Sequence, residues 1–447
     1  MTRLLREFSA HPQFCVGACS VLNTRSLTWI GDRLPELQTY SVDFHIHSRY
    51  SGATSSRMVI DTIAQQARLK GLTFVGTGDV FHPSWFENIK AELEEIAEGT
   101  FEHPRYQTKF ILTVEVEDRH RVNHLIFLPS LTAVENMREE LVKHSSDIDT
   151  DGRARVGLDA PEIVDMAMDH DCLVGPSHAF TPWTSMYKEF DSMRACYGDR
   201  VKDVKFLELG LSADTSMADR IAELWDVTFL ANSDAHSPWP DKLGREFNRF
   251  ELVEPTYAEI IKAIKRENGR RIMLNVGFDP RLGKYHMTAC SRCYNQFTFE
   301  QAKASRWRCN KCSGWVKKGV WDRVNELSDY PAPKHPPHRP NYLRIAPLAE
   351  VIALALGEKN THAPGVQAMW EKLVARFGNE IGVLIDVPPE ELANAAGAKV
   401  AAVIKAFRAG ELKVVPGGGG RYGYLEIPLE LATTLPPKAQ RTLTDFG

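Results

Sequence analysis

The 447-residue sequence lacks any apolar run long enough to cross a bilayer, and its first 26 residues lack the continuous apolar core of a signal peptide. These absences argue against an integral membrane protein, and we expect a cytoplasmic one. An excess of positive charge is also missing, because the formal net charge is −4, which argues against a general nucleic-acid binder. The composition, 43% hydrophobic and 25% charged, is that of a globular protein large enough for two or three domains.

Cysteine is scarce, with eight residues, and half of them fall in one pattern, C-x2-C-x15-C-x2-C. This spacing supplies two pairs of thiolates on tight turns and is typical of a structural Zn2+ site. Two disulfides are the alternative, which a reducing compartment and the two-residue gaps disfavour. The four residues are Cys290, Cys293, Cys309 and Cys312.

Positive charge is concentrated around this cysteine pattern. Between Arg281 and Arg344 the sequence has thirteen Lys or Arg residues and four Asp or Glu residues, an excess of nine. A Zn2+ ion with four thiolates adds about two negative charges, which leaves an excess of about seven. Aromatic residues are interleaved with these cations, so the segment favours contact with the phosphates and bases of nucleic acid.

From about residue 39 to 275, short apolar runs alternate with helical patterns. Runs such as SVDFHIH, LTFVGTGD and VTFLANSDAH predict buried strands, and TKFILTVEVE predicts one further strand. SRMVIDTIAQQARLKG and ENIKAELEEIAEG have the apolar spacing of helices. This alternation predicts an α/β fold with a parallel sheet or barrel.

The remainder of the chain has a different pattern. A proline-rich stretch predicts an extended connector, helical patterns follow it, and two short strand patterns flank Gly417–Gly420. Such glycines can cradle phosphate, but no helix follows them, so a flexible hairpin loop is the favoured interpretation. The expected parts are an N-terminal extension of unclear role (1–38), an α/β domain (39–278), a zinc-ribbon-like module (284–325), the connector (326–345) and a mainly helical C-terminal domain ending in a β hairpin (346–430).

Metal-binding residue types recur where the predicted strands end. His45 and His47 lie one residue apart, so in a strand both side chains point to the same face. The strand ends of parallel α/β folds converge on one side, where functional sites are built. A His and carboxylate set of this size suits two or three divalent metals, because a lone catalytic zinc needs only about three protein ligands. The set comprises His45, His47, Asp79, His82, Glu115, His124, His178, Glu208, Asp234 and His236.

Single members of this set also have structural explanations. Asp79 can cap the turn that follows it, Glu208 can be a surface charge, and His124 can be a core histidine. The two paired patterns, HIH at 45–47 and DAH at 234–236, favour a metal site more strongly than any single residue does.

The motifs DFHIHS, VGTGD, TVEVE, PSHAF and NSDAH resemble those of the PHP (polymerase and histidinol phosphatase) superfamily. A longer ordered series, from DFHIHSRYSGATS through NSDAHSPWPDKLGRE and VWDRVNELSD to PGGGGRYG, is similar to the endonuclease Q family over residues 40–425. The resemblance implies a PHP-type distorted (β/α)7 barrel with a trinuclear metal centre, followed by a four-cysteine zinc module and a helical C-terminal part.

The resemblance also implies roles for individual residues. Glu115 would bridge two metals and would form the catalytic group with Asp234 and His236. Ser51-Gly52-Ala53 departs from the carboxylate or histidine that many PHP enzymes have there, which puts the filling of all three metal positions in question. The implied metal ligands are His45, His47, Asp79, His82, Glu115, His124, His178, Asp234 and His236.

The resemblance implies base contacts for two polar residues, and positions in loops beside the ligand set indicate substrate contacts for two tryptophans and two basic residues. They are Asn232 and Ser233 for a flipped base, Trp85 and Trp183 for stacking on it, and Lys242 and Arg245 for the phosphate backbone. The tryptophans can instead plug the barrel rim, and the basic pair can instead lie in a solvated loop.

Together these features predict a metal-dependent endodeoxyribonuclease. The resemblance implies that it cuts DNA on the 5′ side of deaminated bases (uracil, hypoxanthine, xanthine) or abasic sites, leaving a 3′-hydroxyl and a 5′-phosphate. A small-molecule phosphoesterase of the histidinol-phosphatase type is the alternative enzyme, and a non-catalytic DNA-binding scaffold is the third hypothesis. The expected cofactors are one structural Zn2+ and two or three divalent metals among Zn2+, Mn2+, Mg2+ and Fe2+, and the expected partner is DNA containing deaminated bases.

Overall fold

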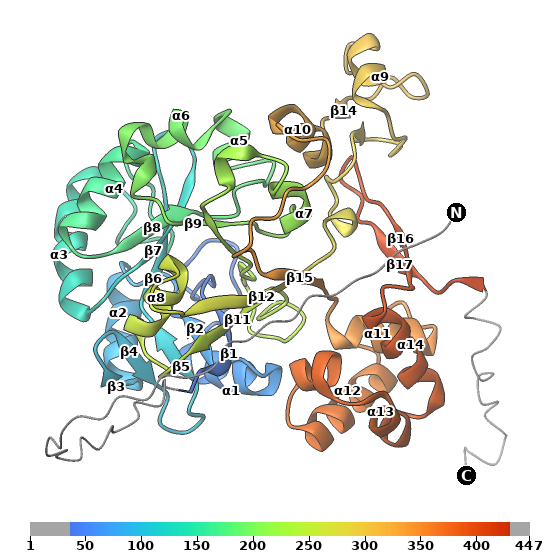
Figure 1. The fold of residues 1–447 in the computed structure, drawn as a ribbon, viewed down its shortest axis with the longest axis horizontal. Helices are drawn as coiled ribbons and strands as arrows, with labels where there is room; N and C mark the ends of the chain where they lie inside the picture. Colours follow the sequence, from blue (N-terminus) through green and yellow to red (C-terminus); the bar gives the residue numbers. More distant parts are fainter. Residues whose placement is uncertain (1–35, 430–447) are drawn as a thin grey trace, which may run out of the picture. The chain divides into compact units, whose positions relative to one another are not determined.

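The largest sheet in the structure, a computed structural model that describes residues 36–429, has eight strands. The expected extension at 1–38 therefore lies almost entirely outside the described residues. In spatial order the strands are β15 (Asn341–Arg344), β12 (Arg271–Gly277), β11 (Phe247–Leu252), β1 (Gln38–Asp43), β2 (Phe74–Gly76), β5 (Lys109–Ile111), β4 (Thr100–Glu102) and β3 (Glu94–Ala97). Strands β1, β2 and β5 pair in parallel, whereas β11 pairs antiparallel with β1 and with β12 (Figure 1).

Two smaller sheets complete the α/β part. β9 (Phe206–Glu208) and β10 (Thr228–Leu230) are parallel, but β6 (Thr113–Glu117), β7 (Asn123–Phe127) and β8 (Leu173–Pro176) are antiparallel. The antiparallel set was not predicted. The β6–β7 pair is antiparallel because only five residues join the two strands, a length that permits a hairpin but not a parallel crossover.

The segment TKFILTVEVE forms two strands, so the prediction of one strand was wrong. β5 ends at Ile111 and β6 begins at Thr113 in a different sheet. The Thr113 hydroxyl donates to the carbonyl of Phe44 at 3.1 Å and accepts from the Gly78 amide at 3.1 Å. The Thr113 side chain thus makes hydrogen bonds that backbone groups would make in a continuous strand, and the chain can turn from one sheet to the other.

Helices cover the α/β part much as the apolar spacing predicts, with one exception. The first predicted helix is present and ends at Gly71, which has a left-handed backbone (φ 101°). The pattern ENIKAELEEIAEG was predicted to be helical throughout, but its second half is strand β3, paired with β4. The helices are α1 (Ile60–Lys70), α2 (Pro83–Glu92), α3 (Leu131–Leu141), α4 (Ala160–Asp169), α5 (Met186–Glu189), α6 (Met193–Tyr197), α7 (Thr215–Ala218) and α8 (Tyr257–Lys265).

The cysteine module and the C-terminal part consist of short elements and a helical group. The proline-rich connector ends in β15, which joins the large sheet in parallel with β12. Helices α11 to α14 pack against one another, and a β hairpin follows them (Figure 1). The elements are β13 (Ala289–Cys290), α9 (Phe299–Ala304), β14 (Val316–Lys317), α10 (Val320–Leu327), α11 (Leu348–Leu356), α12 (Pro364–Phe377), α13 (Pro389–Ala396), α14 (Ala398–Arg408), β16 (Lys413–Val415) and β17 (Tyr424–Glu426).

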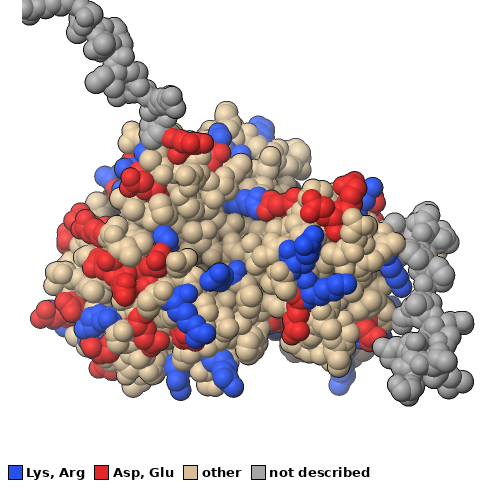
Figure 2. All heavy atoms as spheres, turned by 90° about the horizontal axis from the view of Figure 1, so that it is seen from below, with Lys and Arg blue, Asp and Glu red and all other residues tan. Residues whose placement is uncertain are grey.

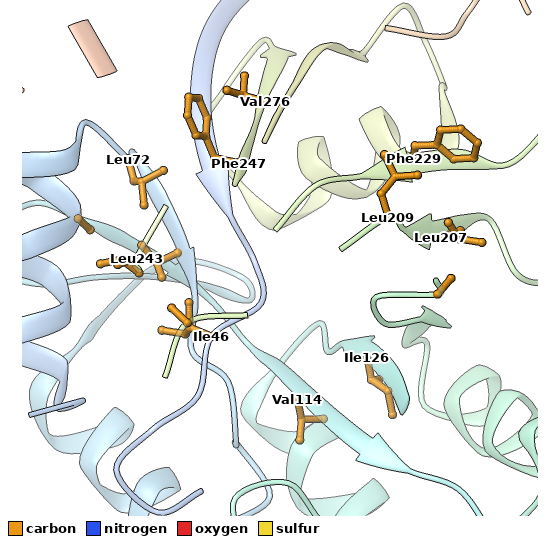
Figure 3. Packing of buried hydrophobic residues seen from close by; sticks show 14 of the residues in the cluster. Ile46, Leu72, Val114, Ile126, Leu207, Leu209, Phe229, Leu243, Phe247 and Val276 are labelled. Atoms are coloured by element: carbon orange, nitrogen blue, oxygen red, sulfur yellow. The ribbon is translucent and has the colours of Figure 1, made fainter. Parts of the chain in front are cut away.

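Apolar side chains from several strands pack together in the interior (Figure 3). Ile46, Val114 and Phe247 are almost fully buried in one cluster, which extends to the C-terminal helices. On the face in Figure 2, acidic side chains gather toward the left and basic ones lie in the centre and along the lower edge. Within residues 36–429, no helix combines the length and the apolar character that a membrane span requires.

A buried ion pair joins the α/β part to the C-terminal helices. Lys70 Nζ lies 2.8 Å from Glu380 Oε1 and also donates to the carbonyl of Pro240 at 2.8 Å. Glu380 accepts two further hydrogen bonds, from the Leu348 amide and from the Trp370 indole. Because these groups satisfy both charges away from water, loss of one partner leaves the other buried and unpaired.

We expect Glu380→Ala to lower the free energy of unfolding by about 3–5 kcal/mol, measured by chemical denaturation. The exposed pair of Lys413 and Glu426 supplies the control, since solvent screens this pair and Lys413→Ala should change the free energy of unfolding far less. Equal effects of the two substitutions would show that the buried pair does not hold the two parts together.

A second buried carboxyl lies where the connector meets the large sheet. Glu246 accepts from the Phe278 amide at 2.9 Å and from the Tyr342 hydroxyl at 3.4 Å. Burial raises the pKa of Glu246 to about 8, so the folded protein keeps a proton that the unfolded chain has lost above its usual pKa near 4.5. The free energy of unfolding therefore falls as the pH rises between these two values.

Glu246→Gln should remove this contribution, because a neutral amide cannot ionise. Between pH 6 and pH 8 the wild type should lose about 2 kcal/mol more stability than the variant, measured by denaturation at both pH values. Parallel losses in the two proteins would mean that Glu246 is already ionised in the folded state.

Candidate metal centre

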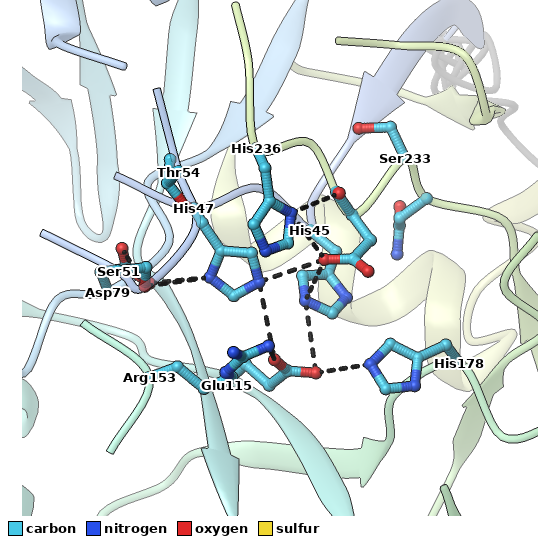
Figure 4. Close-up of polar contacts among 12 residues, drawn as sticks. His45, His47, Ser51, Thr54, Asp79, Glu115, Arg153, His178, Ser233 and His236 are labelled. Atoms are coloured by element: carbon cyan, nitrogen blue, oxygen red, sulfur yellow. Dashed lines mark hydrogen bonds and ion pairs between the residues drawn. The ribbon is translucent and has the colours of Figure 1, made fainter. Parts of the chain in front are cut away.

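A single pair of backbone contacts brings the two paired motifs together. β1 ends at Asp43, so His45 and His47 follow the strand rather than end it. Ile46 forms a parallel bridge with Ala235, in which the His47 amide donates to the Ala235 carbonyl at 3.0 Å. Both bridge residues are buried, so the residues that flank them project to the other side of the chain. That side holds the side chains of both motifs (Figure 4).

One oxygen of Asp234 lies among three imidazole rings. Asp234 Oδ1 is 3.1 Å from His47 Nε2, 3.8 Å from His45 Nε2 and 3.5 Å from His236 Nδ1. Ligand atoms of His45, His47 and Asp234 all lie within 4.8 Å of one another. These distances suit a shared cation with nitrogen and oxygen ligands.

Glu115 lies at the centre of β6 rather than at a strand end, and its two oxygens face different histidines. Oε1 is 2.9 Å from His178 Nε2 and 3.5 Å from His45 Nε2. Oε2 is 3.5 Å from His47 Nε2. A carboxylate placed in this way fits a bridge between two cations.

The buried atoms at this centre support the same interpretation. Five of them form no hydrogen bond of suitable geometry, although imidazole nitrogens and carboxylate oxygens lie close together; they are His45 Nε2, His47 Nε2, Glu115 Oε1, Glu115 Oε2 and Asp234 Oδ1. Buried polar atoms without partners are costly and rare. All five face one another, and divalent cations would satisfy them together, so the residues present fit the metals that the sequence predicts.

A carboxylate contacts the Nδ1 atom of His45, and another contacts the Nδ1 atom of His47. Glu208 Oε2 is 2.8 Å from His45 Nδ1, and Asp79 Oδ1 is 3.0 Å from His47 Nδ1. Such contacts turn Nε2 of each ring toward the centre and increase its strength as a ligand. Burial alone lowers the pKa of His47, but Asp79 and Asp234 raise it to about 9.

Asp79 was predicted to be a metal ligand, and the structure uses its oxygens differently. Its second oxygen accepts from the Ser48 amide and hydroxyl, both at 2.6 Å, and from the Ser51 hydroxyl at 2.9 Å. Ser51, which marks the departure from the family pattern, therefore supports Asp79. The structure gives Asp79 the role of orienting His47, and it gives Glu208 the matching role for His45, which the sequence did not indicate.

Two predicted ligands lie apart from the centre. Strand pairing sets His124 opposite Val116, so its side chain is on the face of β6 and β7 away from Glu115. There the His124 ring contacts the Tyr197 hydroxyl at 2.8 Å and Asp118 at 3.2 Å. His82 stacks on Tyr50 with ring centroids 4.3 Å apart, and neither histidine belongs to a metal-sized cluster of the described residues.

The two polar candidates for base contact are fully buried. Asn232 accepts from the Phe44 amide at 3.0 Å and donates to Glu208 at 2.9 Å. The Ser233 amide donates to Asp43 at 3.0 Å. Asn232 already uses its amide to hold the carboxylate that contacts His45, which argues against a role for Asn232 in base recognition. The contact of Ser233 with a base stays a prediction.

The other substrate candidates divide into buried and exposed residues. Trp85 is buried in the core, and its indole donates to the carbonyls of Thr77 and Gly78, so its role is structural. Trp183 is 49% exposed. Arg245 donates to the carbonyl of Ser233 at 3.0 Å, whereas Lys242 pairs with Asp241 at the surface.

Left-handed backbone recurs at this centre. Asp79, His178 and Asp234 have φ values of 51°, 27° and 48°, a region that residues other than glycine seldom occupy. Next to His178, a Cβ on Gly210 would lie 2.5 Å from the histidine Cβ, so only glycine fits there. Strained backbone of this kind concentrates at functional sites, where the surrounding structure holds it.

Arg153 is a residue of the centre that the sequence pattern missed, because its loop follows no predicted strand. Its guanidinium makes no hydrogen bond to the described residues, and Nη1 lies 3.7 Å from Glu115 Oε2 (Figure 4). The neighbouring Gly152 amide donates to the Tyr50 carbonyl at 3.1 Å. A Cβ on Gly152 would lie 2.4 Å from the Asp79 carboxylate, so the loop is packed tightly against the centre.

The four cysteines of the zinc pattern form a second cluster. The Sγ atoms of Cys290 and Cys312 are 3.5 Å apart, as are those of Cys293 and Cys309. Burial would raise the pKa of Cys290, but backbone amides of Cys293 and Arg292 lower it to about 6. Four sulfur atoms within 4.8 Å fit the tetrahedral Zn2+ site that the spacing predicts.

Comparison with known proteins places these two clusters in context. Two family profiles match, one described as PHP-associated over residues 214–268 and one described as the MJ0043 C-terminal domain over residues 347–411. The uncharacterised protein MJ0043 of Methanocaldococcus jannaschii is 50% identical over 255 residues, which are 56% of this chain but only 31% of that protein. The uncharacterised protein YqxK of Bacillus subtilis is 32% identical over 410 residues, which are 86% of this chain and 98% of that protein.

Two solved structures are similar over nearly their whole length. The lesion-specific endonuclease PfuEndoQ from Pyrococcus furiosus is 48% identical with a TM-score of 0.85, and the match covers 91% of this chain and 98% of that one. A structure of endonuclease Q in complex with a 27-mer duplex substrate carrying an abasic lesion at the active site is 48% identical with a TM-score of 0.83. That match covers 92% of this chain and 100% of the other.

If Glu208 orients His45 as a ligand, Glu208→Ala should weaken metal binding in the α/β part about 10- to 100-fold. Metal titration followed by elemental analysis measures this effect without any assay of activity. Cys290→Ser is the matched control, because it should remove the zinc of the cysteine cluster and leave the other metals in place. Full metal content in the Glu208 variant would contradict the assigned role.

Proposed function

The chain belongs to the endonuclease Q family, and we propose that it cuts damaged DNA by metal-dependent hydrolysis of the phosphodiester on the 5′ side of the lesion. The lesions are deaminated bases (uracil, hypoxanthine and xanthine) and abasic sites. Family membership confirms the predicted PHP-type α/β fold with a four-cysteine module and a helical C-terminal region. The protein is thus a DNA-repair endonuclease.

The choice of damaged DNA as the substrate rests on the solved complex of a 48% identical relative. In that complex an abasic lesion of a DNA duplex lies at the active site. A small-molecule phosphoesterase needs the metal centre alone, whereas this chain also has the cysteine cluster in a segment rich in Lys and Arg. Neutralisation of several phosphates by such a segment makes binding strongly dependent on salt.

Six residues would hold two or three divalent metals, with Glu115 as the bridge between them. Zn2+, Mn2+, Mg2+ and Fe2+ are all compatible with imidazole and carboxylate ligands. Such metals lower the pKa of bound water and neutralise charge on the attacking and leaving oxygens. The six residues are His45, His47, Glu115, His178, Asp234 and His236.

Arg153 would add a positive charge beside the phosphate to the charge of the metals. Its planar guanidinium suits bidentate contact with a phosphate, and its lack of hydrogen bonds to the described residues leaves all its donors available. Because its loop is packed against Asp79, the backbone that carries Arg153 is held close to the centre. Arg153 would hold the phosphate in line while the P–O bond to the 3′ oxygen breaks, and that oxygen leaves as the 3′-hydroxyl.

Selection of deaminated bases follows from their weak pairing. Extruding a mispaired base from the helix costs only a few kcal/mol, less than extruding a paired one. Asn232 is engaged with Glu208, so other residues would supply further base contacts. Trp183, which is exposed and lies five positions after His178, is available to stack on a base at or beside the lesion.

A nicking assay on 5′-labelled duplexes with one uracil, one hypoxanthine or one abasic site tests the proposal. With Mg2+ or Mn2+, we expect one cut on the 5′ side of the lesion and no cut in an undamaged duplex. Asp234→Asn should abolish the cut. Arg153→Ala should slow it roughly 100- to 1,000-fold, while Arg155→Ala, a substitution at an exposed neighbour that pairs with Asp147, should leave it unchanged.

Other outcomes separate the alternatives. Hydrolysis of a small phosphomonoester with no cut in any duplex would replace the nuclease with a phosphoesterase. Binding of lesion DNA without hydrolysis of either substrate, with the metal centre filled, would indicate a scaffold.

A further inference from the structure

The glycine tract near the C-terminus fixes the place of a hairpin loop. Gly417 accepts from the Met287 amide at 3.0 Å, and the Gly420 amide donates to the Lys284 carbonyl at 2.9 Å. A Cβ would lie 2.5 Å from the Gly283 oxygen at Gly417, and 2.4 Å from the Cys290 oxygen at Gly419. The tract is therefore neither a flexible loop nor a phosphate cradle, because its backbone lies directly on the chain that enters the cysteine module.

This docking sets side chains from three distant segments side by side. Lys284 Nζ lies 5.3 Å from the centroid of the Tyr285 ring and 5.6 Å from that of the Tyr422 ring. Tyr285 in turn meets Trp183 edge to face at a centroid distance of 4.7 Å. We call the group formed by Trp183, Lys284, Tyr285 and Tyr422 the aromatic ledge.

The ledge is open to solvent and positively charged. Trp183 and Tyr422 are 49% and 66% exposed. In the part of the chain that the structure describes, neither Lys284 nor the adjacent Arg421 forms an ion pair with a carboxylate. Large exposed rings beside uncompensated cations are unusual on a surface with no partner.

One end of the ledge is tied to the metal centre. The Thr181 hydroxyl lies 3.2 Å from His178 Nδ1 and donates to the carbonyl of Trp183 at 2.8 Å. His178 Nε2 faces Glu115. A strand whose phosphate lies at the metals could therefore continue along Trp183 toward the cysteine module.

We propose that the aromatic ledge binds the unpaired stretch of the DNA strand next to the lesion. Bases would stack on Trp183 and Tyr422, and Lys284 and Arg421 would contact the flanking phosphates. Exposed rings can bind base faces only where those faces are unstacked, and a lesion provides that locally. In an intact duplex, only the phosphates are accessible to this surface. This inference rests on the proposed function and identifies the part of the substrate that it handles.

Crosslinking and affinity measurements on the full chain test the ledge. In an Asp234→Asn background, which prevents cutting, 5-iodouracil placed one or two nucleotides from an abasic site should crosslink to Trp183 or Tyr422 on irradiation. The same substitution in an undamaged duplex should give no such crosslink. Trp183→Ala and Tyr422→Ala should each weaken binding of the lesion duplex about 5- to 150-fold and binding of the undamaged duplex less than about twofold.

Further variants separate stacking from charge and from folding. Lys284→Ala should lower the slope of log affinity against log salt by about one. Gly419→Ala should act like Tyr422→Ala, because the added Cβ displaces the hairpin. Trp225→Ala is the control, since this tryptophan is also exposed but lies in the turn before β10, at the opposite end of the strand from Asp234.

The ledge and the proposed function fail in distinguishable ways. If the unmodified protein nicks lesion DNA but the ledge variants bind lesion DNA like the Trp225→Ala control and give no crosslink, the ledge is wrong and the nuclease stands. If the unmodified protein cuts no duplex, the proposed function fails, and the ledge loses its basis with it.

Discussion

The parallel bridge between Ile46 and Ala235 is the constraint on which the metal centre depends. Two segments almost 190 positions apart meet there through backbone hydrogen bonds, and the bridge residues are buried in the core. Because side chains alternate along an extended chain, burial of these two residues forces both flanking pairs to the same side. A shift of one residue in this pairing would turn the ligands toward the apolar core and the apolar side chains toward the metal centre.

Carboxylates hold this arrangement from several directions. Asp43 accepts from the amides of Ser233 and Gly244, both at 3.0 Å, and so fixes the loop that carries Asp234. Burial raises the pKa of Asp43 to about 6. Asn232 ties Glu208 to the backbone of Phe44. The ligands are therefore oriented before any metal arrives, which favours tight and selective binding.

The same loop is supported from outside the α/β part. Lys70 reaches the carbonyl of Pro240, a few residues after the metal motif, and pairs with Glu380 of the C-terminal helices. The C-terminal hairpin similarly contacts the chain that enters the cysteine module. Both contacts join parts of the chain that sequence patterns separate.

The sequence by itself determined the alternation of strands and helices, the four-cysteine pattern, the paired motifs and the family. All of these depend on residue types at short, regular spacings, which local periodicity and ligand chemistry define. Only the tertiary structure decided which predicted ligands meet. His124 lies on the face of β7 that points away from Glu115. Asp79 and Glu208 contact the Nδ1 atoms of His47 and His45. Arg153 lies beside Glu115 in a loop that has no regular sequence pattern. Strand pairing, the bend at Leu112 and buried hydrogen bonds act between residues far apart in the chain, so no local pattern can indicate them.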